Sequence, residues 1–206
     1  MVSNQLLETA IEQFANEGFD GASTRDIARA SGTAMSSITY HFGGKGGLYL
    51  AAADHVAATI RGWLGDAVEH AAAHPPADRE EAVEAVVRLF DQFARMMLDP
   101  AFKTHCLFLL REQQAPTEAF DHIFSSVVGP FSSVLLPLVE QARPDLSTDA
   151  ARATMILCFG QALVLRAGSA SLCRLFGVTE IDAGLADFLR VRLRANVRSI
   201  LRETNA

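Results

Sequence analysis

The spacing of apolar residues predicts helices along the whole chain. Apolar side chains recur every three or four positions over residues 6–15, with polar residues on the opposite face, and Gly18 ends this first helix. Two short helices are predicted at residues 24–30 and 34–41, separated by the small residues 31–33. A short helix, a small-residue turn and a second short helix with an uncharged outer face form the helix-turn-helix pattern.

A long helix is predicted from residue 48 to the proline pair at 75 and 76, and it measures roughly 40 Å at 1.5 Å per residue. The helical spacing then continues to the end of the chain, with no alternating strand pattern and no internal repeat. Prolines 130 and 137 predict a kink or break, because proline removes a backbone hydrogen bond. The other predicted helices cover residues 78–99, 102–113, 117–142, 147–168, 170–176 and 182–203.

The pattern therefore predicts an all-α fold in two parts. Residues 1–48 form a three-helix head that contains the helix-turn-helix pattern. Residues 49–206 contain the long helix and a helical bundle, and the long helix links the two parts.

Composition supports a globular protein, because half of the 206 residues are hydrophobic and only a fifth are charged. The net charge of −6 gives no general attraction to polyanions, so any contact with nucleic acid needs a few well-placed cations. The head itself is not basic. In the first 45 residues, acidic side chains outnumber basic ones. The basic residues are Arg25, Arg29 and Lys45, and the acidic residues are Glu8, Glu12, Glu17, Asp20 and Asp26.

The cysteines and the apolar segments indicate a cytoplasmic protein. Cys106, Cys158 and Cys173 are odd in number and widely spaced, as expected for reduced thiols in the cytosol. The first ten residues show no basic and apolar pattern of a secretory signal. The longest apolar run, residues 155–165, is too short to cross a bilayer, so we expect no membrane segment.

The glycine-rich stretch from Gly43 to Gly47 favours an anion. Glycine permits unusual backbone angles, the start of a helix presents unpaired N–H groups, and Lys45 adds a full charge. A nucleotide-binding P-loop is excluded, because no strand precedes the stretch and no Ser or Thr follows the lysine. Two interpretations remain, a DNA phosphate at Lys45 or a simple turn with a solvated lysine.

The remaining polar candidates give no strong sign of an enzyme, a cofactor or a metal. His70 and His74 have a spacing that permits metal binding, but the glutamate of a zincin motif is missing and solvated histidines are far commoner. His105 and Cys106 have no partner at a suitable spacing, so core or pocket positions are expected. Because no nucleophile elbow or paired-carboxylate pattern is present either, we expect a non-enzymatic protein with no cofactor and no metal site.

A second set of residues is expected to line a ligand pocket in the bundle. Arg111 and Glu112 follow a very apolar helical turn, so their burial would demand a partner, which is either each other, a neighbouring chain or a ligand. A surface ion pair is an equal alternative. Some aromatic and methionine side chains line a cavity rather than fill the core, because small-molecule pockets are mostly apolar. The candidate pocket residues are Phe93, Met97, His105, Phe108, Arg111, Phe124 and Phe159.

The head resembles the DNA-binding region of the tetracycline-repressor (TetR) family of one-component transcriptional regulators. The resemblance rests on the stretch LLETAIEQFANEGFDGASTRDIARASGTAMSSITYHFGGKGGLYLAA, about the first quarter of the chain. The segment LREQQAPTEAFD, followed by a proline-broken helix, is similar to the CecR-like branch of that family. This resemblance implies an all-helical homodimer that binds a palindromic operator and releases it when a small molecule occupies the C-terminal domain.

The resemblance also implies roles for individual residues of the head. Thr24 and Arg25 would bind phosphates, Tyr40 and His41 would contact the backbone or base methyls, and Lys45 would hold a phosphate. The residues that would face the major groove are Met35, Ser36, Ser37 and Thr39. The two helices at residues 147–168 and 182–203 would form the dimer surface.

Three positions depart from the family pattern. The family usually has serine where Ala34 stands, so the third helix lacks its usual N-cap, a loss typically of about 1 kcal/mol. Thr39 replaces a common tyrosine and Gly46 a common glutamate.

We therefore expect a cytoplasmic, homodimeric regulator, in the first place a repressor, that binds double-stranded operator DNA and a small apolar or amphipathic effector. Two-fold symmetry then requires half-sites about 34–36 Å apart, or a multiple of that distance. The alternative hypothesis is a helical small-molecule binding or carrier protein without DNA-binding activity, which the acidic head and Ala34 would suit.

Overall fold

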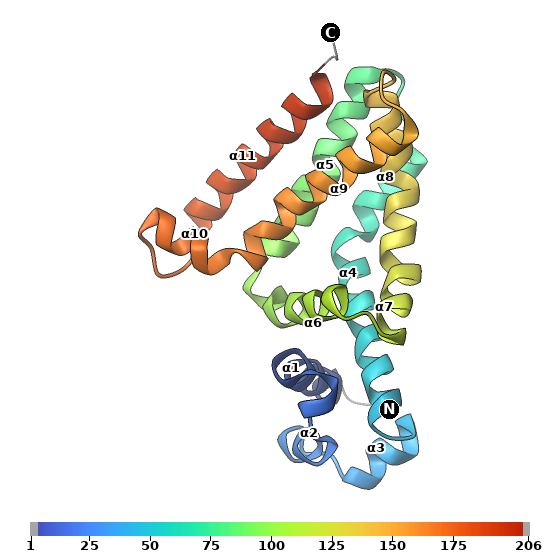
Figure 1. Ribbon diagram of the computed structural model, residues 1–206, viewed down its shortest axis with the longest axis vertical. Coiled ribbons are helices and arrows are strands. Elements are labelled where there is room, and N and C mark those ends of the chain that lie inside the picture. Colours follow the sequence, from blue (N-terminus) through green and yellow to red (C-terminus); the bar gives the residue numbers. More distant parts are fainter. Residues whose placement is uncertain (1–3, 204–206) are drawn as a thin grey trace. The chain divides into compact units, whose positions relative to one another are not determined.

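The computed structural model describes residues 4–203, and every regular element in this range is a helix (Figure 1). The predicted all-α class is confirmed. Residues 1–3 and 204–206, at the outer ends of the two predicted domains, lie outside the described residues. The elements are α1 (Asn4–Gly21), α2 (Thr24–Ala30), α3 (Met35–Phe42), α4 (Lys45–Ala73), α5 (Arg79–Leu98), η1 (Pro100–Phe102), α6 (Lys103–Gln114), α7 (Glu118–Ile123), η2 (Phe124–Val128), α8 (Gly129–Ala142), α9 (Thr148–Ala167), α10 (Ser169–Phe176) and α11 (Ala183–Arg202).

Packing divides the chain into two compact units. Unit 1 comprises residues 1–61 and 103–128, and unit 2 comprises residues 62–102 and 129–206. Helix α4 therefore belongs to both units, and α6 and α7 pack with the head rather than with the rest of the bundle. The predicted boundary after residue 48 separates a DNA-binding head from a ligand-binding bundle. It is a division by function rather than by compactness, so it stays a prediction.

Unit 1 is built on the apolar face of α1, which packs against α2 and α6, while α2 packs against α3. The face is buried as its helical spacing predicted, and Gly18 interrupts the helix with a φ of 76° that favours glycine. Phe19 then folds back, so that its ring lies 6.4 Å from that of Phe14 and 5.1 Å from that of Tyr49. The buried residues of α1 are Leu6, Ala10, Ile11, Phe14 and Ala15.

Unit 2 is centred on α5, which packs against α8, α9 and α11 (Figure 1). Helix α5 is apolar around most of its circumference, as expected of a helix covered on several sides. Phe93 stacks on Phe159 of α9 with ring centroids 4.6 Å apart. At the C-terminal end of α5, Arg166 Nε donates to the Met97 carbonyl at 2.6 Å and Arg166 Nη2 to the Asp99 carbonyl at 2.7 Å, which pairs groups that a helix end leaves exposed.

Local capping chemistry explains where five of the helices begin. Side-chain oxygens at the N-caps of these helices accept hydrogen bonds from backbone N–H groups two or three residues later. The capping residues are Ser23, Asp78, Thr117, Ser147 and Asp182.

The helix predicted over residues 117–142 contains a π-helical segment just before Pro130, whereas no interruption occurs at Pro137. Helix α7 ends at Ile123, and the π-helical η2 follows before α8 begins at Gly129. Pro130 lies in the first turn of α8, where proline is tolerated, whereas Pro137 lies inside the helix and is exposed.

Two stretches, Glu118–Ala142 and Thr148–Ala167, are long and apolar enough by length and composition alone to cross a membrane. Core helices of soluble proteins pass the same test, so this is weak evidence for a membrane segment.

Candidate DNA-binding surface and ligand cavity

The helix-turn-helix is held in place by a few buried side chains. Ile27 and Ala28 of α2 and Ile38 of α3 are buried, and the Ser31 hydroxyl donates to the Ile27 carbonyl at 2.8 Å in the turn. Helix α3 begins after Ala34 without a side-chain cap. The opposite side of α3 is thereby left facing outward.

The residues expected to read DNA lie on this outward side of α3. Tyr40 has 83% of its surface exposed and Met35 has 45%, while Ser37 is half-buried. The side chains are small or uncharged apart from the terminal histidine, so they can approach base edges without charge repulsion. The exposed residues of this face are Met35, Ser36, Thr39, Tyr40 and His41.

The cations of the head occupy two places. Arg25 is exposed in the first turn of α2, next to the half-buried Thr24, whereas Arg29 pairs with Asp26 at 2.6 Å. Lys45 opens α4, and its Nζ donates to the Asp20 carbonyl at 3.1 Å and lies 4.9 Å from the centre of the Phe19 ring. These contacts hold the ammonium group beside the N-terminus of α4, where anions are favoured.

The turn before α4 depends on its glycines. Gly43 and Gly44 have φ angles of 72° and 120°, which other residues rarely adopt. Gly47 has a different requirement, since a Cβ on this residue would lie 1.8 Å from the Phe42 carbonyl oxygen. The sequence pattern placed Gly47 only within a glycine-rich stretch and did not indicate this close approach.

The seven residues expected to bind a ligand divide between the two units. Phe93 and Met97 are buried and Phe159 is half-buried in unit 2. The other four belong to unit 1, where Phe124 has 48% of its surface exposed. The structure therefore does not bring the seven together within one unit, and their role in binding stays a prediction. The four in unit 1 are His105, Phe108, Arg111 and Phe124.

The partners of Arg111 and Glu112 lie within unit 1. Arg111 Nε donates to the Ala15 carbonyl at 2.5 Å and its Nη2 to the Asn16 carbonyl at 2.6 Å, which ties α6 to the end of the main segment of α1. Glu112 is buried and accepts a hydrogen bond of 2.5 Å from the Tyr49 hydroxyl. Burial and the neighbouring Glu112 carboxylate raise the pKa of Tyr49 well above its usual value, so its phenol remains a donor.

His105 has neighbours that the sequence did not reveal. Its Nε2 lies 3.5 Å from Glu8 Oε1, and the same oxygen lies 2.9 Å from His55 Nε2. The three residues come from α6, α1 and α4, so no short spacing could have connected them.

The cysteines are free thiols, as their spacing predicted. Cys106 and Cys158 are buried and Cys173 is half-buried. Burial raises the pKa of the Cys158 thiol to about 11, so it is protonated and unreactive near neutral pH.

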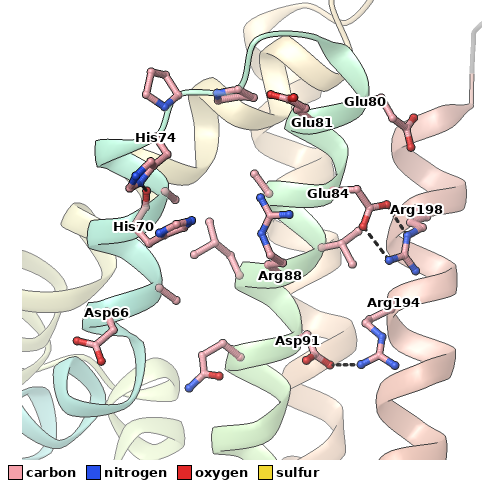
Figure 2. Close-up of a pocket in the computed structure, with 18 of the residues that line it drawn as sticks. Asp66, His70, His74, Glu80, Glu81, Glu84, Arg88, Asp91, Arg194 and Arg198 are labelled. Carbon is pink, nitrogen blue, oxygen red and sulfur yellow. Dashed lines mark hydrogen bonds and ion pairs between the residues drawn. The ribbon is translucent and has the colours of Figure 1, made fainter.

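A cavity of about 960 Å³ opens in unit 2 between the C-terminal part of α4, α5 and α11. Its volume lies at the upper end of the range typical of small-molecule sites, roughly 300–1,000 Å³. Figure 2 shows His70 and His74 on the α4 side, and Arg194 and Arg198 on the α11 side. Arg88 lies on α5 between these two walls. None of the seven expected ligand residues lines this cavity.

The cavity wall contains several ion pairs between α5 and α11. Arg198 donates two hydrogen bonds to Glu84, at 2.6 and 2.8 Å, and these bonds, with the nearby arginine charges, hold the pKa of that carboxyl below its usual value. Asp91 accepts from Arg190 Nη2 at 2.6 Å and from Arg194 Nη1 at 3.0 Å. Burial opposes ionisation of Asp91, but these arginines outweigh it and lower its pKa.

Two family models match the chain, one in each part. The model described as bacterial regulatory proteins, tetR family, matches residues 6–52. The model described as the C-terminal domain of the HTH-type transcriptional dual regulator CecR matches residues 79–203, more than half of the chain.

Relatives and solved structures agree with these matches. The HTH-type transcriptional dual regulator CecR of Shigella flexneri is 29% identical over 204 residues, which cover 96% of this chain and 90% of the relative. SCO4454, a TetR-family transcriptional regulator from Streptomyces coelicolor, has a TM-score of 0.63 at 19% identity, with 96% of this chain and 93% of that one covered. FadR of Bacillus subtilis in complex with stearoyl-CoA has a TM-score of 0.61 at 14% identity, with 98% of each chain covered.

Proposed function

Because this chain belongs to the tetR family of bacterial regulatory proteins and has a C-terminal domain of the CecR type, we propose that it represses transcription as an operator-bound homodimer. Its role as a transcriptional regulator, and not as an enzyme, follows from the family. The repressor mode, a palindromic operator and release by an effector belong to the proposal. The observation that carries the proposal is the exposed and largely uncharged face of α3, which supports DNA reading over the alternative of a carrier protein.

In the proposed complex α3 enters the major groove and α2 contacts the backbone beside it. Thr24, Arg25 and Lys45 bind phosphates and set the register. Tyr40 and His41 contact the backbone or base methyls at the end of α3. The residues directed at base edges are Met35, Ser36, Ser37 and Thr39.

A DNA-binding experiment tests this proposal. Fluorescence anisotropy with the promoter DNA that flanks its own gene, against scrambled DNA and over a salt series, measures affinity and selectivity. Tyr40→Ala should weaken operator binding by at least about tenfold, and Lys45→Ala should also lower the salt slope by about one. Arg61→Ala, an exposed substitution on α4, serves as the matched control. Equal affinity for operator and scrambled DNA would contradict the proposal.

An exposed apolar surface in unit 2 supports the homodimer. On α9, Ile156 and Leu157 have 59% and 68% of their surface exposed, and on α11 Phe188 and Val191 each have 51%. Large apolar side chains gathered on adjacent helices commonly mark an interface, which also accounts for the apolar character of α9. A two-fold dimer through α9 and α11 buries this surface.

The charged cavity in unit 2 supports an amphipathic effector over a wholly apolar one. Glu84 and Asp91 are neutralised by arginines, while Arg88 lies between the two walls, so an anionic group is suited to this end of the cavity. To shift operator occupancy from 99:1 to 1:99, the effector must prefer the released state by about 10⁴-fold.

Effector binding is tested with defined probes. Stearoyl-CoA is the first, because the structurally similar FadR forms a complex with it, and stearic acid is the second. An effector should release the operator from the wild-type protein, and Arg88→Ala should raise the concentration needed at least about tenfold without changing operator affinity. Glu118→Ala, an exposed substitution in unit 1, is the control, and native mass spectrometry of the purified protein identifies any ligand carried along. We also propose that the protein acts in the cytoplasm.

A further inference from the structure

We propose that Glu8, His55 and His105 form a binding site for a divalent transition metal of the zinc type. One potential ligand atom from each of the three residues lies within 4.8 Å of the other two. The carboxylate comes from α1 and the two imidazoles from α4 and α6, all within unit 1. The proposal of a metal site does not rest on the proposed DNA binding, because metal binding by the protein can be measured without DNA.

The distances match those of a metal coordination shell. Zinc bonds of about 2.0–2.1 Å in a tetrahedron place neighbouring ligand atoms about 3.3 Å apart. Glu8 Oε1 lies 2.9 Å from His55 Nε2 and 3.5 Å from His105 Nε2, on either side of that value. The two Nε2 atoms face one carboxylate oxygen, so a small local shift admits an ion between the three side chains.

The donor set selects the class of metal. Imidazole nitrogens suit zinc and neighbouring transition metals, whereas Mg²⁺ and Ca²⁺ prefer oxygen ligands throughout. Three protein ligands also leave a fourth tetrahedral position for water or another small ligand.

The site combines two largely buried imidazoles with one exposed carboxylate. The His105 side chain is 6% exposed and fixed in the core, and His55 is 20% exposed, whereas Glu8 is 50% exposed. An ion can therefore reach the site from the Glu8 side and find two imidazoles already positioned by packing. A bound metal would connect α1, α4 and α6 and so stabilise unit 1.

Metal binding is tested with the full-length protein, purified without a histidine tag and treated with a chelator. Zn²⁺ is titrated against a chromophoric chelator, and one equivalent per chain is expected to bind. Glu8→Gln and His55→Ala remove ligands at accessible positions and should weaken binding beyond the roughly 10- to 100-fold typical of an outer-shell change. His105→Gln is a third variant, with circular dichroism as the check on its folding.

Two controls separate this site from surface histidines. His122→Ala disrupts another histidine–carboxylate pair, with Asp54 at 3.0 Å, and His74→Ala disrupts the stack of His74, which follows α4, on His70. Both variants should bind Zn²⁺ like the wild type. Co²⁺ provides an independent spectroscopic reading, since tetrahedral coordination gives strong visible absorption that Glu8→Gln should abolish. Wild-type affinity in Glu8→Gln and His55→Ala, or loss of the site in a control variant, would overturn the proposal.

Discussion

The Tyr49 hydroxyl donates a hydrogen bond of 2.5 Å to Glu112 Oε1 inside unit 1 and thereby joins α4 to α6. The other carboxylate oxygen of Glu112 accepts from the backbone N–H of Thr117 at 3.1 Å and from its hydroxyl at 2.9 Å. Thr117 is in turn the N-cap of α7. One buried carboxylate thus fixes the positions of three helices, and its hydrogen bonds hold it in the core.

Tyr49→Phe should lower the free energy of unfolding by about 1–3 kcal/mol, because it leaves a buried carboxylate with one donor fewer. Urea denaturation followed by circular dichroism measures the change. Tyr40→Phe is the matched control, since Tyr40 is 83% exposed and is the other of the two tyrosines. An equal loss in both variants would show that the buried hydrogen bond has no special role.

The helices of this fold were predictable from the sequence because each depends on local signals. Ser23, Asp78 and Asp182 mark helix starts by capping chemistry, and Gly18 marks the break in α1. The outward positions on α3 followed from the same helical period. Helix starts and outward positions depend on residues within one or two turns of each other. Packing between distant segments therefore changes few of them.

The packing of distant segments was not predictable in the same way. Nothing local indicates that Arg111 binds carbonyls of α1, about 95 positions away, or that His105 meets Glu8. The cavity beside α5 could not be inferred either, because its charged lining combines residues of α4, α5 and α11. The aromatic residues expected to line a pocket were chosen by type, and type alone does not distinguish a wall from the core.

Ala34→Ser should stabilise the head, because it supplies the missing N-cap of α3. The expected gain in the free energy of unfolding is about 0.5–1 kcal/mol, and operator binding should tighten if α3 is the reading helix. Ser23→Ala provides the opposite change, since the Ser23 hydroxyl accepts from the Asp26 N–H at 3.4 Å. Thermal unfolding and anisotropy measure the two effects. A weaker operator complex in Ala34→Ser, despite a more stable head, would contradict the placement of α3 in the groove.

Asp91→Asn should lower the free energy of unfolding by about 1.5–3 kcal/mol at pH 7, because it removes a carboxylate that binds two arginines of α11. Asp187→Asn is the control, since that carboxylate is 74% exposed and, among the described residues, pairs with Arg190 alone of these two arginines. Urea denaturation of both variants measures the difference.

The lowered pKa of Asp91 predicts that the free energy of unfolding depends on pH in the acid range. The folded-state pKa of Asp91 is lowered, so between this value and the unfolded value of about 4 the unfolded chain binds more protons. Its contribution to stability is therefore complete above the unfolded pKa and is lost as pH falls through the folded pKa. The difference in unfolding free energy between wild type and Asp91→Asn should shrink below about pH 4. A constant difference over the whole acid range would exclude this linkage.

Leu157→Glu should convert the proposed homodimer to monomers, because it places a charge in the apolar surface of α9. Burial of one leucine contributes about 1.5–3 kcal/mol, and two-fold symmetry makes the substitution count twice, so the dissociation constant should rise at least about 100-fold. Leu107→Glu, at a 39% exposed leucine of α6 in unit 1, is the matched control. Sedimentation equilibrium measures both. A wild-type protein that is monomeric at micromolar concentration, or a Leu157→Glu variant that remains dimeric, would place the interface elsewhere and leave the exposed face of α9 and α11 to another partner.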